Sequence, residues 1–236
     1  MYKIPQSGER FLEGQILLIN KPFGWSSFAV VKKIRYLIKK KYNLKKIKVG
    51  HAGTLDPLAT GLLIICTGKF TKKITTIQDA KKVYEGEITF GGSTLSYDLE
   101  TKVTSLKPTN HITLDLVKKT ATTFVGDIAQ KPPAFSALKK DGERLYKKAR
   151  RGEKIDIKSR KVNVDYFNII KFNNPKLTFG IQCSKGTYIR SIANDFGEKL
   201  NSGAYLSKLC RTAIGDYKLT KSINLEDFEN ELNTSF

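Results

Sequence analysis

The shortness of its apolar segments most limits what this sequence can fold into. The longest uninterrupted apolar run is Leu62–Cys66, whereas a membrane-spanning helix needs about 18 such residues. Short apolar runs bounded by glycine, proline or asparagine recur along the chain, as is typical of strands. Strand-like segments outnumber helical ones and often follow one another directly. We therefore predict an α+β fold, with a mixed, largely antiparallel sheet flanked by helices.

The periodicity of apolar residues places the individual elements. Helices are expected at 26–41, 70–78, 114–124, 187–200 and 225–232, and strands at 14–20, 47–50, 62–66, 83–90, 162–172, 177–184 and 205–214. No repeat, low-complexity stretch or linker divides the chain. We expect one domain over residues 1–236, with 126–152 as a basic, protruding, thumb-like insert.

The charge of the chain indicates a polyanionic partner. Its 42 Lys and Arg outnumber 22 Asp and Glu, for a net charge of +20. Nine basic residues fall within 32–48, and a second basic cluster runs from Lys139 to Lys154. One such cluster is typical of a solvated helix face, but two clusters on a chain this basic favour a surface that binds nucleic acid phosphates. Membrane binding is not expected, because neither basic cluster, read as a helix, offers an apolar face that is free of the core.

Several standard sites can be excluded from the residues present. Gly68-Lys69 lacks the context of a phosphate-binding P-loop, and neither GxSxG nor HExxH occurs. With His51 and His111 as the histidines, a histidine-ligated metal or a Ser-His-Asp triad is hard to build. Three cysteines lie far apart and the N-terminus has no apolar signal core, so we expect a cytoplasmic protein without disulfides or metal.

The segment GHAGTLDPLATG, residues 50–61, is the most informative loop. Its glycines allow close approach of a ligand, and Pro57 stiffens the chain directly after Asp56. A carboxylate held between Leu55 and Leu58 could act as a nucleophile or a base. The plainer alternative is an Asp-Pro turn in which Asp56 bonds only nearby amides, and spacing alone favours that turn.

Two further residues have a functional and a structural interpretation. Tyr84, on a predicted strand, could stack on a base, although filling a core is the usual role of such a tyrosine. Arg190 lies among apolar residues at the start of a predicted helix and needs a carboxylate partner if it is buried. Asp195 and Glu198 on the same helix compete with Asp56 for that place.

At this point the chain resembles the TruB family of tRNA pseudouridine synthases. The resemblance covers about Gly14 to Tyr217 and rests on blocks that occur in the family's order. These are Lys21-Pro22 before Ser26-Ser27, GHAGTLDPLATGLL with the following Gly68-Lys69 turn, KVYEGEITFG, QKPPAFSALKKDGERLYKKARRG, CSKGTYIRSIANDFGEKL and LCRTAIGDY.

The resemblance implies that uridine 55 in the T-loop of tRNA is flipped out and isomerised to pseudouridine without a cofactor. Asp56 matches the essential aspartate, which either attacks the sugar or base or removes a ribose proton. The other matched positions support catalysis or bind RNA. Arg190 would orient Asp56, Tyr84 would stack on the flipped base, Leu209 would line the pocket, Lys21 would support the loop, and His51 would fill the gap left by the flipped nucleotide.

The resemblance also implies how the RNA is held. The insert 126–152, with Lys139, Lys140, Arg144, Lys147 and Arg151, matches a segment that closes over RNA. Two departures stand out: the C-terminal PUA-type module of many relatives is not expected here, and Leu95 replaces a frequently acidic residue. We expect a stand-alone monomer that binds the T-stem-loop of tRNA. The alternatives are the catalytic subunit of a guide-RNA-directed particle and a non-catalytic RNA-folding factor.

Overall fold

The computed structural model describes residues 4–5 and 7–234, which divide into two compact units. One unit combines Met1–Tyr84 with Cys210–Phe236, and the other is Glu85–Leu209. Within the described residues, the helices are all too short or too polar to cross a bilayer. The assignment of 1–236 to one domain without a C-terminal module stays a prediction.

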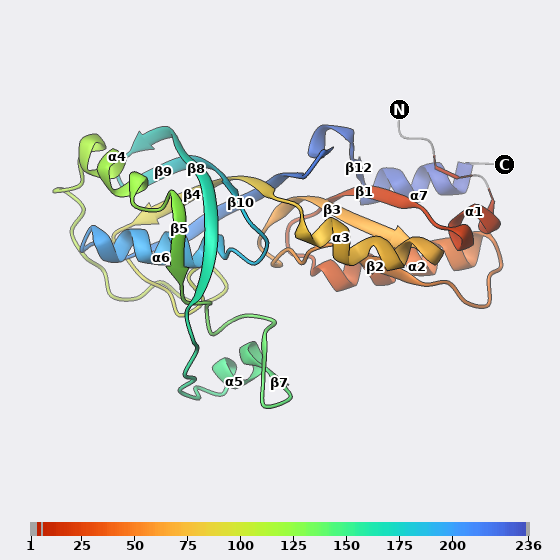
Figure 1. Ribbon diagram of the computed structural model, residues 1–236, viewed down its shortest axis with the longest axis horizontal. Helices are drawn as coiled ribbons and strands as arrows, with labels where there is room; N and C mark the ends of the chain where they lie inside the picture. The colour runs from red at the N-terminus through yellow and green to blue at the C-terminus, as the bar shows by residue number, and fades with distance from the viewer. Residues whose placement is uncertain (1–3, 6, 235–236) are drawn as a thin grey trace. The chain divides into compact units, whose positions relative to one another are not determined.

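The first unit is built on the strand order β12–β1–β3–β10 (Figure 1). β3 pairs antiparallel with β1 and with β2, and β10 pairs antiparallel with β11. β12 runs parallel to β1, and β10 runs parallel to β3. The bounds are β1 Ile16–Lys21, β2 Val49–His51, β3 Thr60–Thr67, β10 Ala204–Ile214, β11 Tyr217–Lys218 and β12 Ile223–Asn224.

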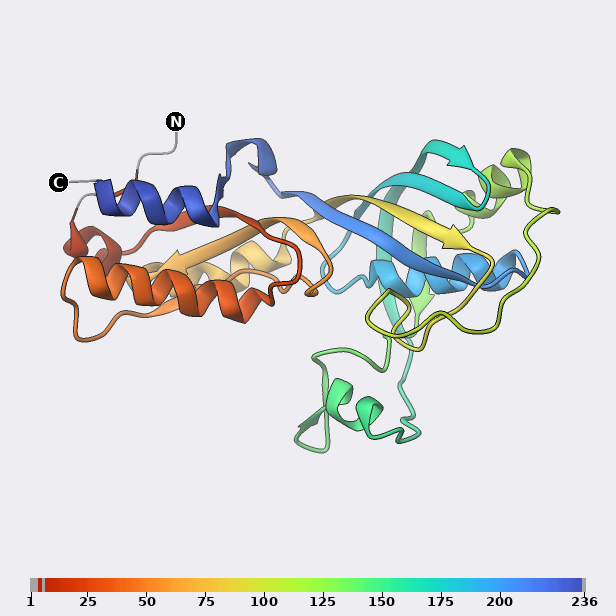
Figure 2. The ribbon, with the colours of Figure 1, turned by 180° about the vertical axis from the view of Figure 1, so that it is seen from behind.

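Helices cover both faces of this sheet. Leu63 and Ile65 of β3 belong to one apolar cluster with α2 (Ser27–Lys41) and α7 (Leu225–Thr234), helices that lie side by side in Figure 2. Ile64 belongs to a second cluster with α3 (Ile74–Asp79) and η1 (Gly68–Lys73). Burial on both faces explains why β3 carries the longest apolar run of the sequence. α1 (Gly8–Glu13) and η2 (Leu219–Lys221) complete the unit.

The second unit continues with the strand order β10–β4–β9–β8–β5. The bounds are β4 Lys82–Phe90, β5 Gly126–Gln130, β8 Arg160–Asn173 and β9 Lys176–Cys183. β8 pairs antiparallel with β5 and with β9. Two of its helices are α4 (Leu114–Thr122) and α6 (Ile189–Lys199). Its core is aromatic: the ring centroids of Phe124 and Phe196 are 5.3 Å apart, and those of Phe167 and Phe179 are 5.1 Å apart.

The predicted fold class is confirmed, and the structure adds detail to the insert. Residues 126–130 form a sheet strand, so the segment outside the sheet begins after Gln130. It contains the short hairpin of β6 (Lys139–Lys140) and β7 (Glu143–Arg144), followed by α5 (Leu145–Arg150). The basic character of this segment thus falls on a hairpin and one short helix.

Candidate active site

The loop that carries Asp56 lies between two paired strands. β2 and β3 are antiparallel, with His51 opposite Ile65, and the Ala52 N–H donates to the Ile64 carbonyl at 2.8 Å. Asp56 is half-buried, and its carbonyl accepts a hydrogen bond from the Ala59 N–H at 3.1 Å. A backbone turn therefore exists at Asp56-Pro57, whereas the two interpretations of the Asp56 carboxylate considered from the sequence both stay predictions.

Lys21 ties this loop to the end of β1. Its buried ammonium donates to the carbonyls of Pro22 at 2.9 Å, Trp25 at 2.7 Å and Pro57 at 3.2 Å. Burial lowers the pKa of Lys21 from 10.5 to about 8, the Asp56 carboxylate opposes that shift, and the Arg211 charge adds to it. Lys21 therefore supports the loop by its contacts, and the Asp56 carboxylate lies near enough to favour the charged form of Lys21.

Arg211 holds the other side of the same loop. This buried residue of β10 donates from Nε to the Leu62 carbonyl at 2.9 Å, from Nη1 to the Thr54 carbonyl at 3.3 Å and from Nη2 to the Gly53 carbonyl at 2.9 Å. Gly61 permits this approach, because a Cβ there would lie 2.4 Å from the Arg211 carbonyl oxygen. Carbonyl oxygens from both ends of the loop thus converge on one guanidinium.

His51 stands where β2 enters the loop. It is half-buried, and its Nδ1 is buried without a hydrogen-bond partner among the described residues. Burial and the charge of Arg211 lower the pKa of His51 below its usual 6.5. The lowered pKa favours the neutral imidazole near pH 7.

The structure places the other expected pocket residues on β4 and β10. Tyr84 is buried on β4, and Leu209 is half-buried on β10. The burial of Tyr84 is compatible with both interpretations considered from the sequence. The roles of both residues stay predictions.

In the second unit, Arg190 lies in the first turn of α6 within a buried polar network. Its Nη1 donates to the Ser96 carbonyl and its Nη2 to the Phe135 carbonyl, each at 3.0 Å. Its Nε lies 3.6 Å from Oδ2 of Asp98, and both side chains are buried. Within this unit the carboxylate that faces Arg190 belongs to Asp98, and neither Asp195 nor Glu198 takes that place. Leu95, one of the noted departures, is exposed and outside the network.

The expected RNA-binding residues of the insert differ in how they are engaged. Arg151 is bound by Glu143 at 2.8 Å and by Glu153 at 2.7 Å. Lys140 donates to the Asp156 carbonyl and Arg144 to the Ala137 carbonyl, each at 2.7 Å. Lys139 and Lys147 are both exposed on the same segment. The Arg151 guanidinium would therefore have to exchange carboxylates for phosphate, whereas the amines of exposed Lys139 and Lys147 can meet RNA directly.

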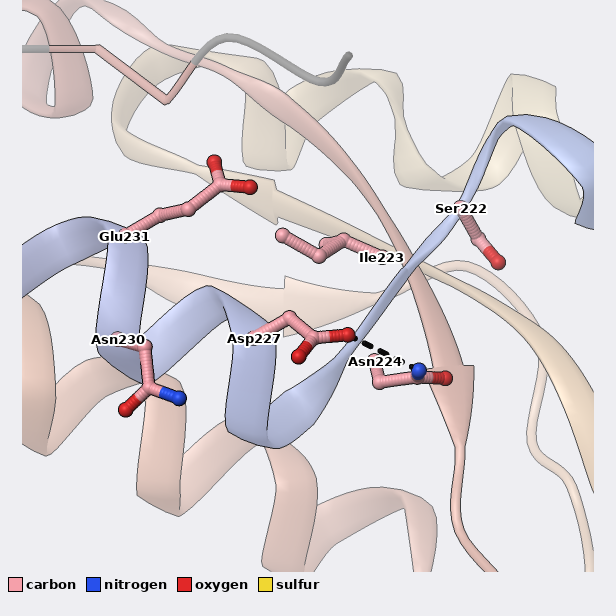
Figure 3. A pocket seen from close by; sticks show the side chains of 6 residues that line it. All are labelled: Ser222, Ile223, Asn224, Asp227, Asn230 and Glu231. Atoms are coloured by element: carbon pink, nitrogen blue, oxygen red, sulfur yellow. Dashed lines mark hydrogen bonds between the residues drawn. The ribbon is translucent and has the colours of Figure 1, made fainter.

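Two surface hollows of the first unit lie elsewhere. One, of about 320 Å³, is lined by Ser222, Ile223, Asn224, Asp227, Asn230 and Glu231, with the Asn224 amide donating to Asp227 at 3.0 Å (Figure 3). The other, of about 490 Å³, is lined by Asn20, Pro22, Trp25, Lys33 and residues 224–227 and 229. Neither lining includes Asp56. Within the described part of the chain, no three His, Cys, Asp or Glu side chains gather as a metal site.

The structure adds three residues to those expected from the sequence, namely Ser27, Asp98 and Arg211. The Ser27 hydroxyl binds both backbone groups of Leu55, directly before Asp56. Arg211 carried a usable signal, because it follows Leu209 and Cys210 in a strand with just one other charge, Lys208, and a charge buried there needs polar partners. Ser27 carried none, since a serine at a helix start is also a common cap.

The chain is similar over most of its length to curated bacterial proteins. A family model described as TruB family pseudouridylate synthase (N terminal domain) matches residues 39–189. A protein named tRNA pseudouridine synthase B from Flavobacterium johnsoniae is 55% identical over 225 residues, covering 95% of this chain and 98% of that protein. One of the same name from Phocaeicola vulgatus is 50% identical over 218 residues, covering 92% and 93%.

Solved structures have the same fold. A chain from the structure titled Crystal Structure of a Cbf5-Nop10-Gar1 Complex matches with a TM-score of 0.71 at 28% identity, over 97% of this chain and 56% of that one. A chain from a structure of an H/ACA RNP bound to a substrate RNA containing 2'-deoxyuridine matches with a TM-score of 0.68 at 25% identity, over 94% and 54%. This chain therefore spans a little over half the length of those proteins.

Proposed function

Since the chain belongs to the TruB family of pseudouridylate synthases and isomerises uridine in tRNA, we propose that its target is uridine 55 of the T-loop and that Asp56 is the catalytic residue. The reaction conserves all the atoms of the nucleoside except for an exchanged proton. The N1–C1′ bond breaks, the uracil turns while it is held, and C5 bonds to C1′. The proton on C5 then leaves, and N1 ends with a proton.

The observation that carries the assignment to Asp56 is the support given to its loop. Three buried side chains, Lys21, Ser27 and Arg211, bind backbone groups on both sides of Asp56. Such restraint favours catalysis because a carboxylate held in place loses little freedom when it meets the reacting sugar. Asp56 either attacks the sugar or base or removes a ribose proton, and both routes need this positioning.

The remaining site residues are proposed from their matched positions. Tyr84 stacks on the flipped uracil and assists proton removal at C5, and Leu209 lines the pocket. Arg190 orients the Asp56 carboxylate. The buried network around Arg190 supports this role, because Ser96, Asp98 and Phe135 keep its guanidinium in one orientation.

Binding of the T-stem-loop is proposed to combine base flipping with phosphate contacts. Flipping costs a few kcal/mol of lost stacking and pairing, which contacts to Lys139, Lys140, Arg144, Lys147 and Arg151 offset. His51 fills the gap that the flipped nucleotide leaves, which suits its neutral imidazole. We propose a cytoplasmic monomer that needs no protein partner and no cofactor.

Two transcripts test the target position. An unmodified tRNA carrying tritium at C5 of its uridines is incubated with the protein alone, and the released tritium is counted. The expected result is stoichiometric release from the natural transcript and none from a transcript with cytidine at position 55. Release that is equal from both transcripts would refute the assignment to position 55. Tight binding without release would instead favour a guide-dependent subunit or a binding factor.

A further inference from the structure

The exposed aromatic side chains of the protein are gathered in one short segment. Among the described residues, the aromatic rings that are more than a third exposed are Phe23 (66%), Trp25 (39%), Phe28 (56%) and Tyr36 (58%). All of them lie in the loop before α2 or on α2 itself. Single exposed apolar side chains are ordinary, but their confinement to 14 consecutive residues, 23–36, is a local feature of this surface.

On α2 the exposed rings alternate with lysines. Phe28, Lys32, Tyr36 and Lys40, here called the aromatic–lysine row, follow one another at steps of four residues and are all exposed. Residues at this spacing are neighbours on a helix surface, and the Lys32 ammonium lies 5.0 Å from the centroid of the Phe28 ring. The opposite face of α2 is buried in the apolar core of the unit. Folding therefore gives no reason for aromatic residues in the row.

The charges around the row favour an anionic partner. α2 contains no Asp or Glu, and within the described residues no carboxylate pairs with Lys32 or Lys40. Lys33, on the flank, is instead held by Glu229 at 2.7 Å. An anionic ligand with flat apolar faces fits an alternation of rings and ammonium groups, and unpaired nucleotides have both properties.

The start of the row is fixed to the catalytic loop by backbone contacts. The N–H of Gly24 donates to the Pro57 carbonyl at 2.9 Å, and Lys21 binds the carbonyls of both Trp25 and Pro57. Phe23 and Trp25 are thus held at a set place relative to the residue that follows Asp56. RNA whose target nucleotide reaches Asp56 passes close to these rings.

We propose that Phe23, Trp25 and the aromatic–lysine row form a stacking surface for unpaired nucleotides of the RNA substrate other than the one that reacts. The rings stack on bases without reading their sequence, and Lys32 and Lys40 contact the adjoining phosphates. The inference rests on tRNA as the substrate, as the proposed function does, and it is independent of which uridine is modified.

The native tryptophan provides the first test, since Trp25 is the single tryptophan of the chain. Stacking on a base is expected to quench its fluorescence saturably when tRNA transcript is added, while heparin, which supplies only negative charge, leaves it unchanged. Unchanged fluorescence at saturating tRNA, or equal quenching by heparin, would overturn the inference for Trp25.

Two kinds of variant separate stacking from charge on the row. Phe28→Ala with Tyr36→Ala is expected to weaken tRNA binding about fivefold or more per stacked ring, with an unchanged salt dependence. Lys32→Gln with Lys40→Gln is expected to reduce the salt slope by about 0.7 to 0.9 for each lost phosphate contact. Phe28→Tyr with Tyr36→Phe keeps the rings and is expected to restore affinity, which guards against a folding defect in the alanine variant.

The matched control is Ile170→Ala, which removes a similarly exposed apolar side chain, 57% exposed, from β8. An affinity unchanged by the Phe28 and Tyr36 substitutions, or lowered equally by Ile170→Ala, would overturn the inference. Binding to anionic phospholipid vesicles that depends on the row, with tRNA affinity unaffected, would assign the row to a lipid surface instead. Tritium release measured on the same preparations keeps the two proposals apart, because release from position 55 can succeed or fail whatever the affinities show.

Discussion

The hydroxyl of Ser27 binds both backbone groups of Leu55: it accepts the Leu55 N–H at 2.8 Å and donates to the Leu55 carbonyl at 2.9 Å. This pair joins the first residue of α2 to the residue before Asp56. Because both groups are buried, the contact fixes the backbone on the N-terminal side of Asp56, the proposed catalytic residue. Lys21 acts similarly on its C-terminal side.

Ser27→Ala removes both bonds and leaves a buried N–H and carbonyl without a partner. We expect the free energy of unfolding to fall by about 1–3 kcal/mol and the single-turnover rate to fall as well. Ser26→Ala is the matched control, because Ser26 caps α2 through the Ala29 N–H and does not touch the loop. Loss of that cap costs about 1 kcal/mol and should leave the rate unchanged. Equal rates in the two variants would contradict the role of Ser27.

Arg211→Lys tests the guanidinium that binds two carbonyls of the loop, Gly53 and Thr54, and the Leu62 carbonyl of β3. A lysine cannot reproduce the planar fork of hydrogen-bond donors. We therefore expect the free energy of unfolding, measured in urea, to fall by about 2–4 kcal/mol and the single-turnover rate to fall as well. Arg10→Lys, at an exposed position of α1, should change neither. A variant with full activity would show that these bonds do not hold the loop in its reactive form.

Gly61→Ala tests the close approach of β3 and β10. The added Cβ would lie 2.4 Å from the Arg211 carbonyl oxygen, at a φ of +99° that L residues rarely adopt. Gly126→Ala shares a positive φ of +89° but meets nothing within 4 Å, so it isolates backbone strain, about 1–3 kcal/mol. Thermal unfolding should show Gly61→Ala as clearly the more damaging change. Similar melting temperatures would mean that the backbones separate easily.

The free energy of unfolding should depend on pH in the alkaline range because of Lys21. Its pKa is about 8 in the folded chain and 10.5 without the fold, so between these values the unfolded state binds more protons. Stability contributed by this group therefore rises with pH in that window, by up to about 1.4 kcal/mol per pH unit. Below about pH 8 the cost of the buried charge is fully present. Urea unfolding from pH 7 to 10.5 measures this slope of the unfolding free energy against pH. The slope should be lost in Lys21→Met and kept in Lys45→Met, a control at an exposed position. An unaltered slope in Lys21→Met would contradict the assignment to Lys21.

Much of the fold could be predicted because its elements have strong local signals. The apolar run of β3 and the helix expected at 26–41 are visible in the sequence, and both are confirmed, with Ser26 as the cap of α2. α1 and β5 were missed: α1 spans only six residues, and the Gly126–Gln130 strand alternates around exposed positions with little apolar content.

The site was predictable only where a motif marks it. Asp56 lies in a distinctive loop, whereas Ser27 and Arg211 bind backbone groups that only folding brings to them, so the sequence does not reveal which groups those are. The Asp98 carboxylate reaches Arg190 from 92 positions away, so nearer acidic residues looked equally suitable. The expected pairing of Arg190 with Asp56 stays a prediction.

The most direct test of the central claim compares two carboxamide substitutions in the tritium assay. Asp56→Asn removes the proposed catalytic carboxylate, and Asp216→Asn makes the same change at an exposed turn. We predict that Asp56→Asn binds tRNA but releases no tritium from position 55, while Asp216→Asn releases it as fully as the unaltered protein. Release by Asp56→Asn at the unaltered rate would contradict the account.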